Sequence, residues 1–590
     1  MIDVLTTRIS PPGTKKKPKL GLALSGGGFR TALFHIGALL RLAELGVLKH
    51  VEVLATVSGG SIVGAAFYLH LLTELEAKRE PLDDGDMVAV VVNLAEQFPE
   101  MVKKNVRIRA FSNYMKNVKM CRADYSRSDR VAELFDRYFL QNLLPGVGSP
   151  VLMRDLDRPD LADGPPSEGC KPRLMINATS LNTGRAWRFS ATTMGEAILS
   201  GQQGDIDRVL RYDAPGTYAD LADHPRDVPL AIAVAASSAF PAGLQPMAIS
   251  GMYEDRIQLT DGGVHDNQGI QALMDADCTH FVASDTGGQM TAQVPAKTSF
   301  LSVLLRSNGI LYGRVRQEQL FRASEHRPRD ARESPLALIH LYRGVAVDRE
   351  AYLLPGGTGG GVTRGPLPEG PSEAFGIDER VMDHLSRIRT DLDSFSEVET
   401  KSLMAAGYLV AGSSISDPNW SGSSFLSPGT VTLPAVVGLD QIGGYLAGPT
   451  DEFLRQLKIG KSRFYKALHI YPAVWAFTLF LGVAAVLVAG WAVWQFWGTG
   501  VPIGWVAVAL TILGLTLAFP MWKLGATFLD TAPATWFRWV RNVVLVGWIA
   551  VLWSNTYLLV FEPMFRHGGS LERLQSKGPP NRRTVPPVSG

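Results

Sequence analysis

The first run of residues that could do chemistry is Ser25–Arg30 (SGGGFR), which separates a short apolar stretch from a helical pattern. Consecutive glycines let the backbone turn sharply and expose several N–H groups at a helix N-terminus, which makes an anion-binding site. Such a site could hold a nucleotide phosphate or the oxyanion that forms during acyl transfer. Both interpretations stay open on this run alone, although it lacks the glycine spacing of the common nucleotide-binding motifs.

A second run, Thr56–Gly60 (TVSGG), favours the acyl-transfer interpretation. It lies between another apolar stretch and another helical pattern, as a nucleophile elbow does. Small residues around Ser58 would let a strained turn push its hydroxyl outward while neighbouring backbones approach closely. Thr56 stands where the strict pattern has its first glycine. Ser61 is a nearby competitor, for which a helix-capping or first-turn hydrogen bond is the expected use.

A serine nucleophile needs a base, and the best candidate is an aspartate. The run Leu259–Gly263 (LTDGG) ends a short apolar strand pattern with Asp261 and two glycines, so that a carboxylate at the end of a strand can be approached closely. None of the eleven histidines has a comparable context. His265 is expected to be a surface residue, and Asn177, at the end of another strand pattern, stays undecided.

These three runs resemble the motifs of the patatin-like phospholipase family, over roughly residues 18–290. The resemblance implies a Ser–Asp dyad without histidine, with Ser58 as the nucleophile and Asp261 as the base. It also implies an oxyanion hole formed by Gly26, Gly27 and Gly28, with Arg30 supporting that loop. The run Ala239–Pro241 is similar to the short apolar run that precedes the last strands in this family. Thr31 and Thr56 depart from the family pattern, because glycine is common at both positions.

The elements that would position these residues form a β-α-β-α pattern. Strands are predicted at Leu20–Leu24 and Val51–Val57, and helices at Phe29–Leu45 and Ile62–Leu75. Short connections of this kind favour a mainly parallel sheet covered by helices, in a three-layer α/β/α fold. Four later apolar segments could extend the same sheet: Leu174–Leu181, Leu230–Ala236, Ile257–Thr260 and Phe281–Ser284.

Changes in composition divide the chain into five predicted parts. The catalytic domain is expected at residues 18–412, with a helical insertion at about 76–170 that could cover the substrate. The other parts are an N-terminal tail (1–17), a linker and juxtamembrane segment (413–465), a transmembrane region (466–565) and a flexible tail (566–590).

The transmembrane prediction depends on long uncharged stretches. Residues 473–497 and 501–522 contain no charged side chain and are long enough, as helices, to cross a hydrocarbon layer of about 30 Å. A third candidate, 543–561, is interrupted by polar residues. Basic residues before the first stretch predict a multi-pass integral membrane protein whose catalytic domain faces the cytoplasm.

Composition excludes several other classes of function. Lys and Arg (58) nearly balance Asp and Glu (56), and a net charge of +2 does not indicate a nucleic-acid partner. Three widely spaced cysteines predict neither a disulfide framework nor a zinc site. The N-terminus lacks the apolar stretch of a secretory signal. No cofactor or metal is therefore expected.

We predict a lipid acyl hydrolase of the phospholipase A or lysophospholipase type, with a membrane lipid as substrate and the bilayer as partner. The alternative is a catalytically silent, membrane-anchored lipid-binding or scaffolding protein on the same fold. A third class, a nucleotide-dependent ATPase, would bind nucleotide at Ser25–Arg30. The oligomeric state stays open.

Overall fold

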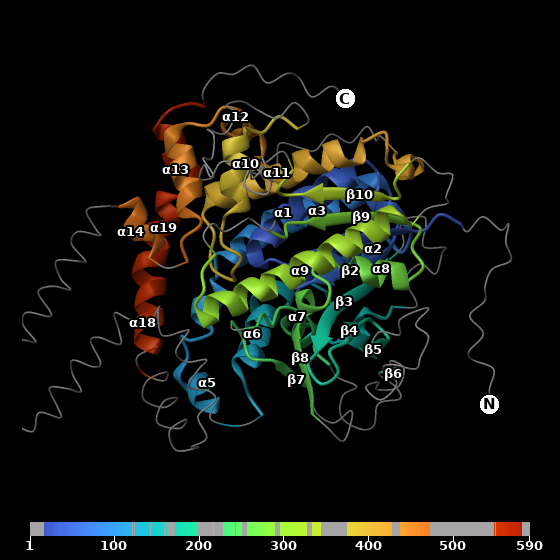
Figure 1. The fold of residues 1–590 in the computed structure, drawn as a ribbon, viewed down its shortest axis with the longest axis horizontal. Coiled ribbons are helices and arrows are strands. Elements are labelled where there is room, and N and C mark those ends of the chain that lie inside the picture. The colour runs from blue at the N-terminus through green and yellow to red at the C-terminus, as the bar shows by residue number, and fades with distance from the viewer. Residues whose placement is uncertain are drawn as a thin grey trace, which may run out of the picture.

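The computed structural model describes residues 17–471, 548 and 550–580. Within these bounds the following residues are not described: 121, 123, 142, 159–160, 162–170, 197–215, 218–227, 242, 250–255, 289–295, 327–332, 344–374, 428–436 and 464. Figure 1 shows the described elements as one body built around a twisted sheet.

Five parallel strands form the centre of this sheet. Their order is β10 (Leu336–His340), β9 (His280–Asp285), β1 (Leu20–Leu24), β2 (Val51–Val57) and β3 (Arg173–Ser180). The other described strands continue from β3 in antiparallel pairs: β4 (Ala186–Phe189), β5 (Thr193–Glu196), β6 (Gly216–Thr217), β7 (Met247–Ile249) and β8 (Ile257–Asp261). The predicted mainly parallel α/β sheet is therefore present.

Side-chain alternation in the central strands creates two apolar faces. In β1, Leu20, Leu22 and Leu24 pack into the larger core cluster, whereas Ala23 belongs to the smaller cluster on the opposite face. In β9, Val282 faces the larger cluster and Phe281 the smaller one. Strands buried on both faces need helices on both sides, which explains the three layers.

The helices of the first face are α1 (Gly28–Glu44), α2 (Gly59–Lys78), α3 (Asp84–Val102) and α11 (Glu397–Ile415). Two glycines bring α1 and α11 together. A Cβ on Gly37 would lie 1.8 Å from the Met404 carbonyl oxygen, and one on Gly407 would lie 2.0 Å from that of Phe34. The two helix backbones are therefore in direct contact, which ties the C-terminal part of the domain to the helix that follows the glycine loop.

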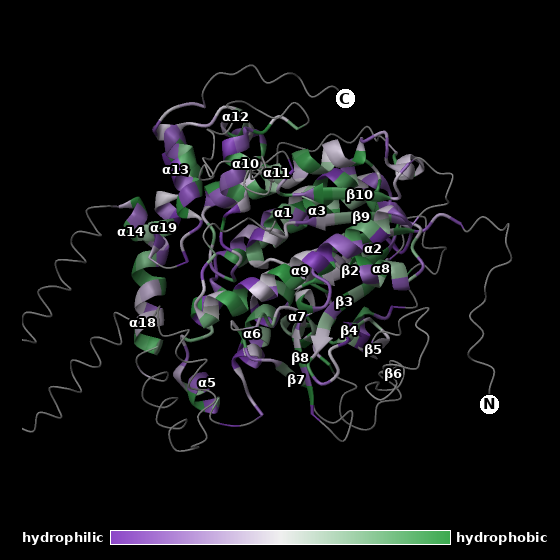
Figure 2. Cartoon of the chain, in the orientation of Figure 1, coloured by the Kyte–Doolittle hydropathy of each residue, from purple (hydrophilic) through white to green (hydrophobic). Residues whose placement is uncertain are grey.

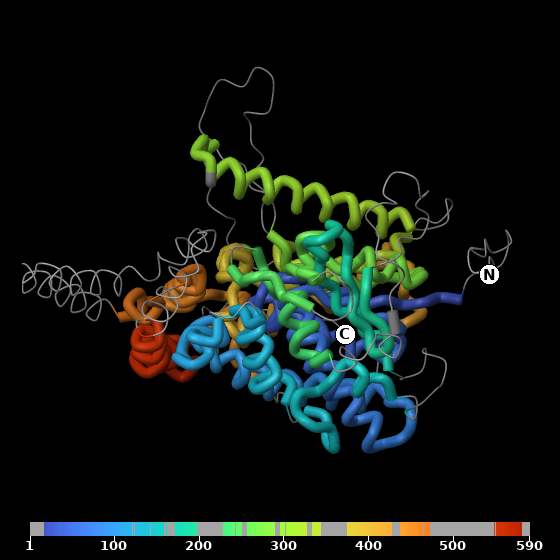
Figure 3. The backbone as a smooth tube through the Cα atoms, turned by 90° about the horizontal axis from the view of Figure 1, so that it is seen from below, coloured from blue at the N-terminus to red at the C-terminus, as the bar shows by residue number. Residues whose placement is uncertain are grey.

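The second face is covered by α8 (Ile270–Asp275) and by the C-terminal end of α9 (Phe300–Ser324). Figure 3 shows α9 as the long yellow-green helix that runs along the outside of the body. Gln319 and Ala323 are its buried residues among those whose side chains are described. Most of α9 is thus a surface element.

The segment 76–170 contains α4 (Val106–Arg109), α5 (Tyr114–Lys119) and α6 (Arg127–Phe135) in addition to α3. One predicted strand segment, Leu230–Ala236, is instead part of helix α7 (Leu230–Ser237). Short apolar runs do not distinguish a buried strand from a buried helix, and every α7 residue except Ile232 is buried. This correction matters because α7 contacts the candidate site.

Beyond α10 (Glu379–Ser386) and α11, helices also form where the sequence suggested a linker, 413–465. They are α12 (Asp440–Ala447) and α13 (Asp451–Ile459), and their residues Ile442, Leu446, Phe453 and Leu457 belong to the main core cluster. In each helix these two core residues are four positions apart, and one such pair is too little to indicate a helix beside a Gly- and Ser-rich sequence. The boundary of the catalytic domain stays a prediction.

The prediction of a multi-pass membrane protein is corrected by the structure. Within the described residues, no helix has both the length and the apolar composition that a bilayer crossing requires, so this localisation and its cytoplasm-facing orientation are not supported. The predicted spans 473–497 and 501–522 lie outside the described residues.

The described part of the third predicted span, 543–561, packs against the rest of the protein. It forms α18 (Ala550–Thr556) and a π-helical turn (Tyr557–Phe561), in which Trp553 and Tyr557 are buried with Ile108 and contact Tyr465. The neighbouring helices are α14 (Lys466–Ile470), α19 (Glu562–Gly568) and α20 (Leu571–Ser576).

Candidate active site

The two residues predicted to do the chemistry meet because two strands share one edge of β3. Strand β2 pairs with the first part of β3, ending with Val57 opposite Asn177. Strand β8 pairs with the next part, where Asp261 lies opposite Ala178. Because β2 and β8 end at adjacent positions of β3, Ser58 and Asp261 come together although they are far apart in the chain.

Ser58 has a strained backbone, as a nucleophile elbow requires. Its φ is 50° and its ψ is −116°, a combination that non-glycine residues rarely adopt. The following glycines allow this turn. A Cβ on Gly59 would lie 2.2 Å from the Gly28 carbonyl oxygen, and one on Gly60 would lie 2.2 Å from that of Leu24. The turn after β2 is therefore packed directly against the glycine loop after β1.

A serine on α7 holds this turn in place. The Ser58 N–H donates to the Ser237 hydroxyl at 2.8 Å, and that hydroxyl donates to the Asn177 carbonyl at 2.6 Å. Ser61 also contacts it, with 2.8 Å between the two hydroxyl oxygens, and donates to the Thr56 hydroxyl at 3.0 Å. The sequence analysis missed Ser237, because a serine that ends a short apolar run carries no distinctive signal.

Asp261 is buried and carries the electrostatic features of a base. Its Oδ1 accepts the Gly263 N–H at 2.7 Å, and the Ser58 side chain is near enough to favour the ionised carboxylate. Burial raises the pKa of Asp261 to about 6, against the opposing effects of the Gly263 N–H and of the Ser58 side chain. A carboxylate with this pKa is ionised at neutral pH and still a better proton acceptor than an exposed aspartate.

The glycine loop leaves two N–H groups available. Gly27 and Gly28 have φ angles of 144° and 63°, and within the described part of the chain neither N–H donates a hydrogen bond. Gly26 differs, because its N–H donates to the Asn267 carbonyl at 3.0 Å. Of the three glycines that the resemblance assigned to the oxyanion hole, only Gly27 and Gly28 can thus donate without breaking an existing bond.

Arg30, at the start of α1 directly after the glycine loop, bonds to backbone groups of distant segments. Its guanidinium donates to the carbonyl oxygens of Ser386 at 2.6 Å, Ile388 at 3.2 Å and Thr286 at 2.7 Å. Burial lowers the pKa of Arg30. These contacts join the start of α1 to the end of α10 and to the segment after β9.

Asn267 is a second residue that the sequence analysis missed. Its backbone carbonyl oxygen accepts the Gly26 N–H. Its side-chain oxygen lies 2.4 Å from the position that a Cβ on Gly26 would take and 2.6 Å from that of a Cβ on Gly263. It therefore touches both the glycine loop and the loop that follows Asp261. A lone asparagine six residues after the aspartate has no sequence pattern that would indicate this contact.

The histidines near these loops have structural surroundings. The Nδ1 of His35 lies 2.7 Å from the Ser284 hydroxyl and its Nε2 lies 3.1 Å from the Ser25 carbonyl oxygen. Burial lowers the pKa of His35 to about 4, so it is neutral at physiological pH. His265 is partly buried, contrary to the expectation of a surface residue, and burial also lowers its pKa.

A network of buried charges supports the loop that contacts Gly28. The Asp391 carbonyl oxygen accepts the Phe29 N–H at 3.1 Å, and its carboxylate pairs with Arg107 at 2.6 Å. Nearby, Asp393 pairs with Arg389 at 2.9 Å and with Lys466 at 2.8 Å. Burial opposes ionisation of Asp393, but the charges of Lys466, Arg107 and Arg389 hold its pKa below its ordinary value.

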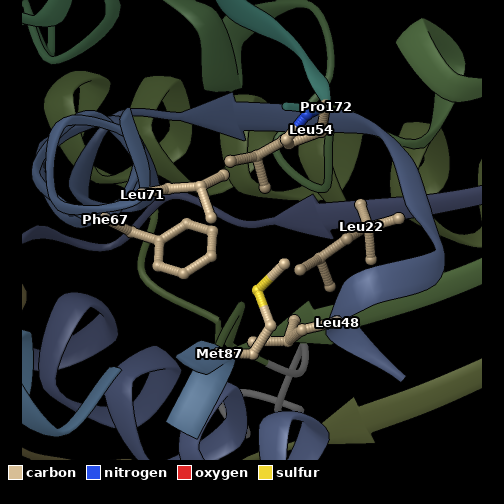
Figure 4. Close-up of a pocket in the computed structure, with 8 residues that line it drawn as sticks. Leu22, Leu48, Leu54, Phe67, Leu71, Met87 and Pro172 are labelled. Atoms are coloured by element: carbon tan, nitrogen blue, oxygen red, sulfur yellow. The ribbon is translucent and has the colours of Figure 1, made fainter. Parts of the chain in front are cut away.

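The cavity shown in Figure 4 is separate from these groups. It lies between β1, β2, α2 and α3, and apolar residues line it: Leu22, Leu48, Val51, Leu54, Phe67, Leu71, Met87 and Pro172. No polar side chain in this lining could bind or activate a substrate, so we interpret it as a packing gap in the core. Within the described residues, no cluster of His, Cys, Asp or Glu has an arrangement that could hold a metal ion.

The domain that contains these residues matches a known protein family. A family model described as patatin-like phospholipase matches residues 22–274, which contain the glycine loop, Ser58 and Asp261. Residues 22–274 are a patatin-like phospholipase domain. The predicted family is thus confirmed for this domain, and lipid hydrolysis is the class of activity that the family suggests.

Curated sequences and solved structures give no further support for the assignment of residues 22–274 to this family. Comparison with curated protein sequences gave no match. Among solved structures, the crystal structure of VipD from Legionella pneumophila is similar at 12% sequence identity and a TM-score of 0.29, covering 94% of this chain and 92% of its own. A likeness at that TM-score supports no argument about fold or function.

Proposed function

We propose that this protein is a lipid acyl hydrolase of the phospholipase A or lysophospholipase type. In this proposal Ser58 is the nucleophile, Asp261 is its base, and the N–H groups of Gly27 and Gly28 stabilise the oxyanion. The observation that carries the proposal is the strand pairing that places Ser58, after the end of β2, beside the buried carboxylate of Asp261 at the end of β8, where burial raises the pKa of that carboxylate to about 6. The strained backbone of Ser58 supports the same assignment.

The first half of the reaction forms an acyl-enzyme. The Asp261 carboxylate accepts the Ser58 proton while the Ser58 oxygen attacks the ester carbonyl carbon. The carbonyl oxygen becomes an oxyanion beside Gly27 and Gly28, where N–H groups without other partners stabilise negative charge. When the tetrahedral intermediate collapses, the alcohol leaves with the proton that Asp261 had taken.

The second half releases the acyl group. Asp261, ionised again, accepts a proton from a water molecule that attacks the acyl carbon of Ser58. Collapse of this second intermediate frees the fatty acid and returns the proton from Asp261 to the Ser58 oxygen. One carboxylate therefore serves as base and acid in both steps, which is consistent with a pKa closer to neutrality than that of an exposed aspartate.

A substrate panel tests the proposal directly. The purified chain should hydrolyse phospholipids or lysophospholipids, and a fluorophosphonate should label Ser58. Ser58→Ala should abolish labelling and turnover. Asp261→Asn should lower turnover by at least about a thousandfold, because an amide cannot accept the proton. Circular dichroism would confirm that both variants are folded.

Ser61→Ala is the matched control, since Ser61 is a buried serine in the same turn that bonds to Thr56 and Ser237. We expect this variant to retain fluorophosphonate labelling. Labelling that depends on Ser61 and survives in Ser58→Ala would overturn the assignment of the nucleophile. Lipid binding by the wild type without any hydrolysis or labelling would favour a catalytically silent lipid-binding protein.

A further inference from the structure

The N-terminal half of α9 exposes an unusual set of apolar side chains. Phe300 is 82% exposed, Leu304 is 53% exposed and Leu311 is 64% exposed. Val303, Leu305 and Ile310 are also exposed. Figure 2 shows hydrophobic colouring along this end of α9, which lies on the outside of the molecule. So many exposed large apolar side chains on one short stretch of helix indicate contact with another apolar phase or partner.

The C-terminal half of α9 anchors the helix. There, Gln319 and Ala323 are buried, and Ala323 packs in the cluster that contains residues of α8. Arg316 donates from Nε to the buried carboxylate of Asp285 at 2.9 Å, and one of its other nitrogens lies 2.6 Å from His340 Nε2. The anchored C-terminal half therefore fixes the position of the whole helix, including its exposed apolar half.

This anchoring places α9 beside the candidate active site. Tyr312 lies in the middle of α9, and burial and, next, the charge of Asp261 raise its pKa to about 12. Four residues further along α9, Arg316 approaches the loop after β9, because a Cβ on Gly287 would lie 3.7 Å from Arg316 Nε and 3.5 Å from Asn267 Nδ2. Asn267 in turn touches the glycine loop.

Two further exposed apolar residues lie next to the site. Phe240 is 59% exposed and follows Ala239, whose carbonyl oxygen accepts the Asp261 N–H at 3.1 Å. Val264 is 38% exposed and lies three residues after Asp261. Ser58 and Asp261 themselves are only 8% and 4% exposed. A buried reacting pair is thus bordered by apolar side chains that face solvent.

The charges of α9 favour a negatively charged partner. Besides Arg316, which pairs with Asp285, the helix between Phe300 and Ser324 carries the basic residues Arg306, Arg314 and Arg322 and a single acidic residue, Glu318. Helices that expose apolar side chains together with arginines bind at the surface of anionic bilayers, where the side chains enter the acyl boundary and the cations face the headgroups. A second protein would need a complementary acidic and apolar groove, whereas a lipid surface already contains both features.

We propose that residues 300–311 of α9, together with Phe240 and Val264, form a docking surface that places the active site on an anionic lipid bilayer. This inference rests on the proposed function, because it explains how a lipid held in an aggregate reaches the buried Ser58. It requires only that the apolar side chains enter the interface.

Vesicle cosedimentation of the full chain tests docking without catalysis. The Ser58→Ala protein should bind vesicles that contain phosphatidylglycerol more tightly than vesicles of phosphatidylcholine alone, and 0.5 M NaCl should weaken that preference. When Leu304→Ser and Leu311→Ser are added to the Ser58→Ala protein, its binding to the anionic vesicles should fall at least about tenfold. Met115→Ser is the matched control, because Met115 is 71% exposed on α5 and belongs to neither the docking surface nor the site.

Hydrolysis by proteins that retain Ser58 separates docking from chemistry. The Leu304→Ser and Leu311→Ser double variant should lose at least about tenfold in the ratio of vesicle hydrolysis to hydrolysis of a monomeric short-chain ester. Met115→Ser should keep the wild-type ratio. An unchanged ratio in the double variant would overturn the docking surface, even if the ester is hydrolysed. Failure to hydrolyse either substrate would refute the proposed function, while the binding data would still decide docking.

Two binding outcomes also count against the proposal. Equal binding to neutral and anionic vesicles would contradict the role of the arginines. A concentration-dependent dimer in size-exclusion chromatography that the double variant abolishes would assign the apolar surface to a second copy of the chain and overturn lipid docking.

Discussion

The Asn177 carbonyl oxygen occupies the space where a side chain at Gly262 would begin, since a Cβ on Gly262 would lie 2.2 Å from it. Asn177 ends the part of β3 that pairs with β2, and Gly262 follows the proposed base. The glycine after Asp261 is therefore required by close packing of two backbones, in addition to any flexibility that it supplies. This contact sets how near Asp261 can come to Ser58.

We expect Gly262→Ala to lower kcat at least about tenfold and to destabilise the protein by about 1–3 kcal/mol, because the added methyl group must displace backbone atoms. Ester turnover and thermal unfolding would measure the two effects. Gly443→Ala is the matched control, since a Cβ there meets no atom within 4 Å and Gly443 lies within α12. That control should stabilise the protein by up to about 1 kcal/mol. Equal behaviour of the two variants would refute the packing argument.

The pH dependence of turnover should report the ionisation of Asp261. Because burial raises its pKa to about 6, the fraction of ionised base falls as the pH drops through that value. We expect kcat/KM for a soluble ester to fall about tenfold between pH 7 and pH 5. A profile that stays flat down to pH 4.5 would indicate a base with an ordinary carboxylate pKa, contrary to this expectation.

Replacement of Asp261 should increase stability at neutral pH. The pKa of the folded state, about 6, lies above the ordinary value of 3.8, so protonation favours the folded state and stability is lost as the pH rises between these values. At pH 7 the ionised carboxylate costs up to about 3 kcal/mol. Asp261→Asn avoids this cost while keeping the side-chain shape.

Denaturant unfolding at pH 7 and pH 4 measures this effect. The Asp261→Asn protein should be more stable than the wild type at pH 7, and the difference should shrink towards pH 4. A variant that is less stable than the wild type at pH 7 would show that the carboxylate contributes net stability through its hydrogen bonds.

The Ser237 hydroxyl should be needed to hold the Ser58 turn. Ser237→Ala leaves the Ser58 N–H and the Asn177 carbonyl oxygen without their shared partner, so we expect kcat to fall about tenfold and stability to fall by about 1–3 kcal/mol. The control is Ser238→Ala, because the neighbouring hydroxyl is also buried but bonds within α7 to the Val234 carbonyl at 2.8 Å. Kinetics of both variants on one soluble ester would compare them. A similar kcat for the two would contradict the positioning role.

The buried ion pairs behind the glycine loop should be sensitive to loss of one partner. Asp393→Asn removes the carboxylate that pairs with the fully buried Lys466 at 2.8 Å, while Arg389 keeps its pair with Glu399, and we expect a loss of about 3–5 kcal/mol in unfolding free energy. Asp124→Asn removes one member of a solvent-exposed pair with Arg122 and should leave the unfolding midpoint unchanged. Equal midpoints for the two variants would show that the buried network adds no stability.

Local patterns were sufficient to predict the elements that carry the proposed chemistry. An apolar strand followed by glycines, or by a serine between small residues, constrains its own turn, so Ser25–Arg30, Thr56–Gly60 and Leu259–Gly263 were recognisable without any coordinates. Short continuous apolar runs likewise predicted β1 and β2, because both faces of these strands are buried, and helical periodicity predicted α1 and α2. The same periodicity failed at α7, a run too short for it to distinguish a helix from a strand.

Only the tertiary structure decided which residues meet. The pairing of β2 and β8 with consecutive parts of β3 brings Ser58 to Asp261. Contacts between distant parts of the chain place Ser237 and Asn267 next to the candidate site, and the N–H of Gly26 is already bonded to Asn267. These relations depend on strand register and on backbone groups distant in the chain, and neither is encoded in a local pattern of residue types. The membrane prediction had the same weakness, because apolar content alone does not specify whether a segment such as 550–561 faces lipid or packs against protein.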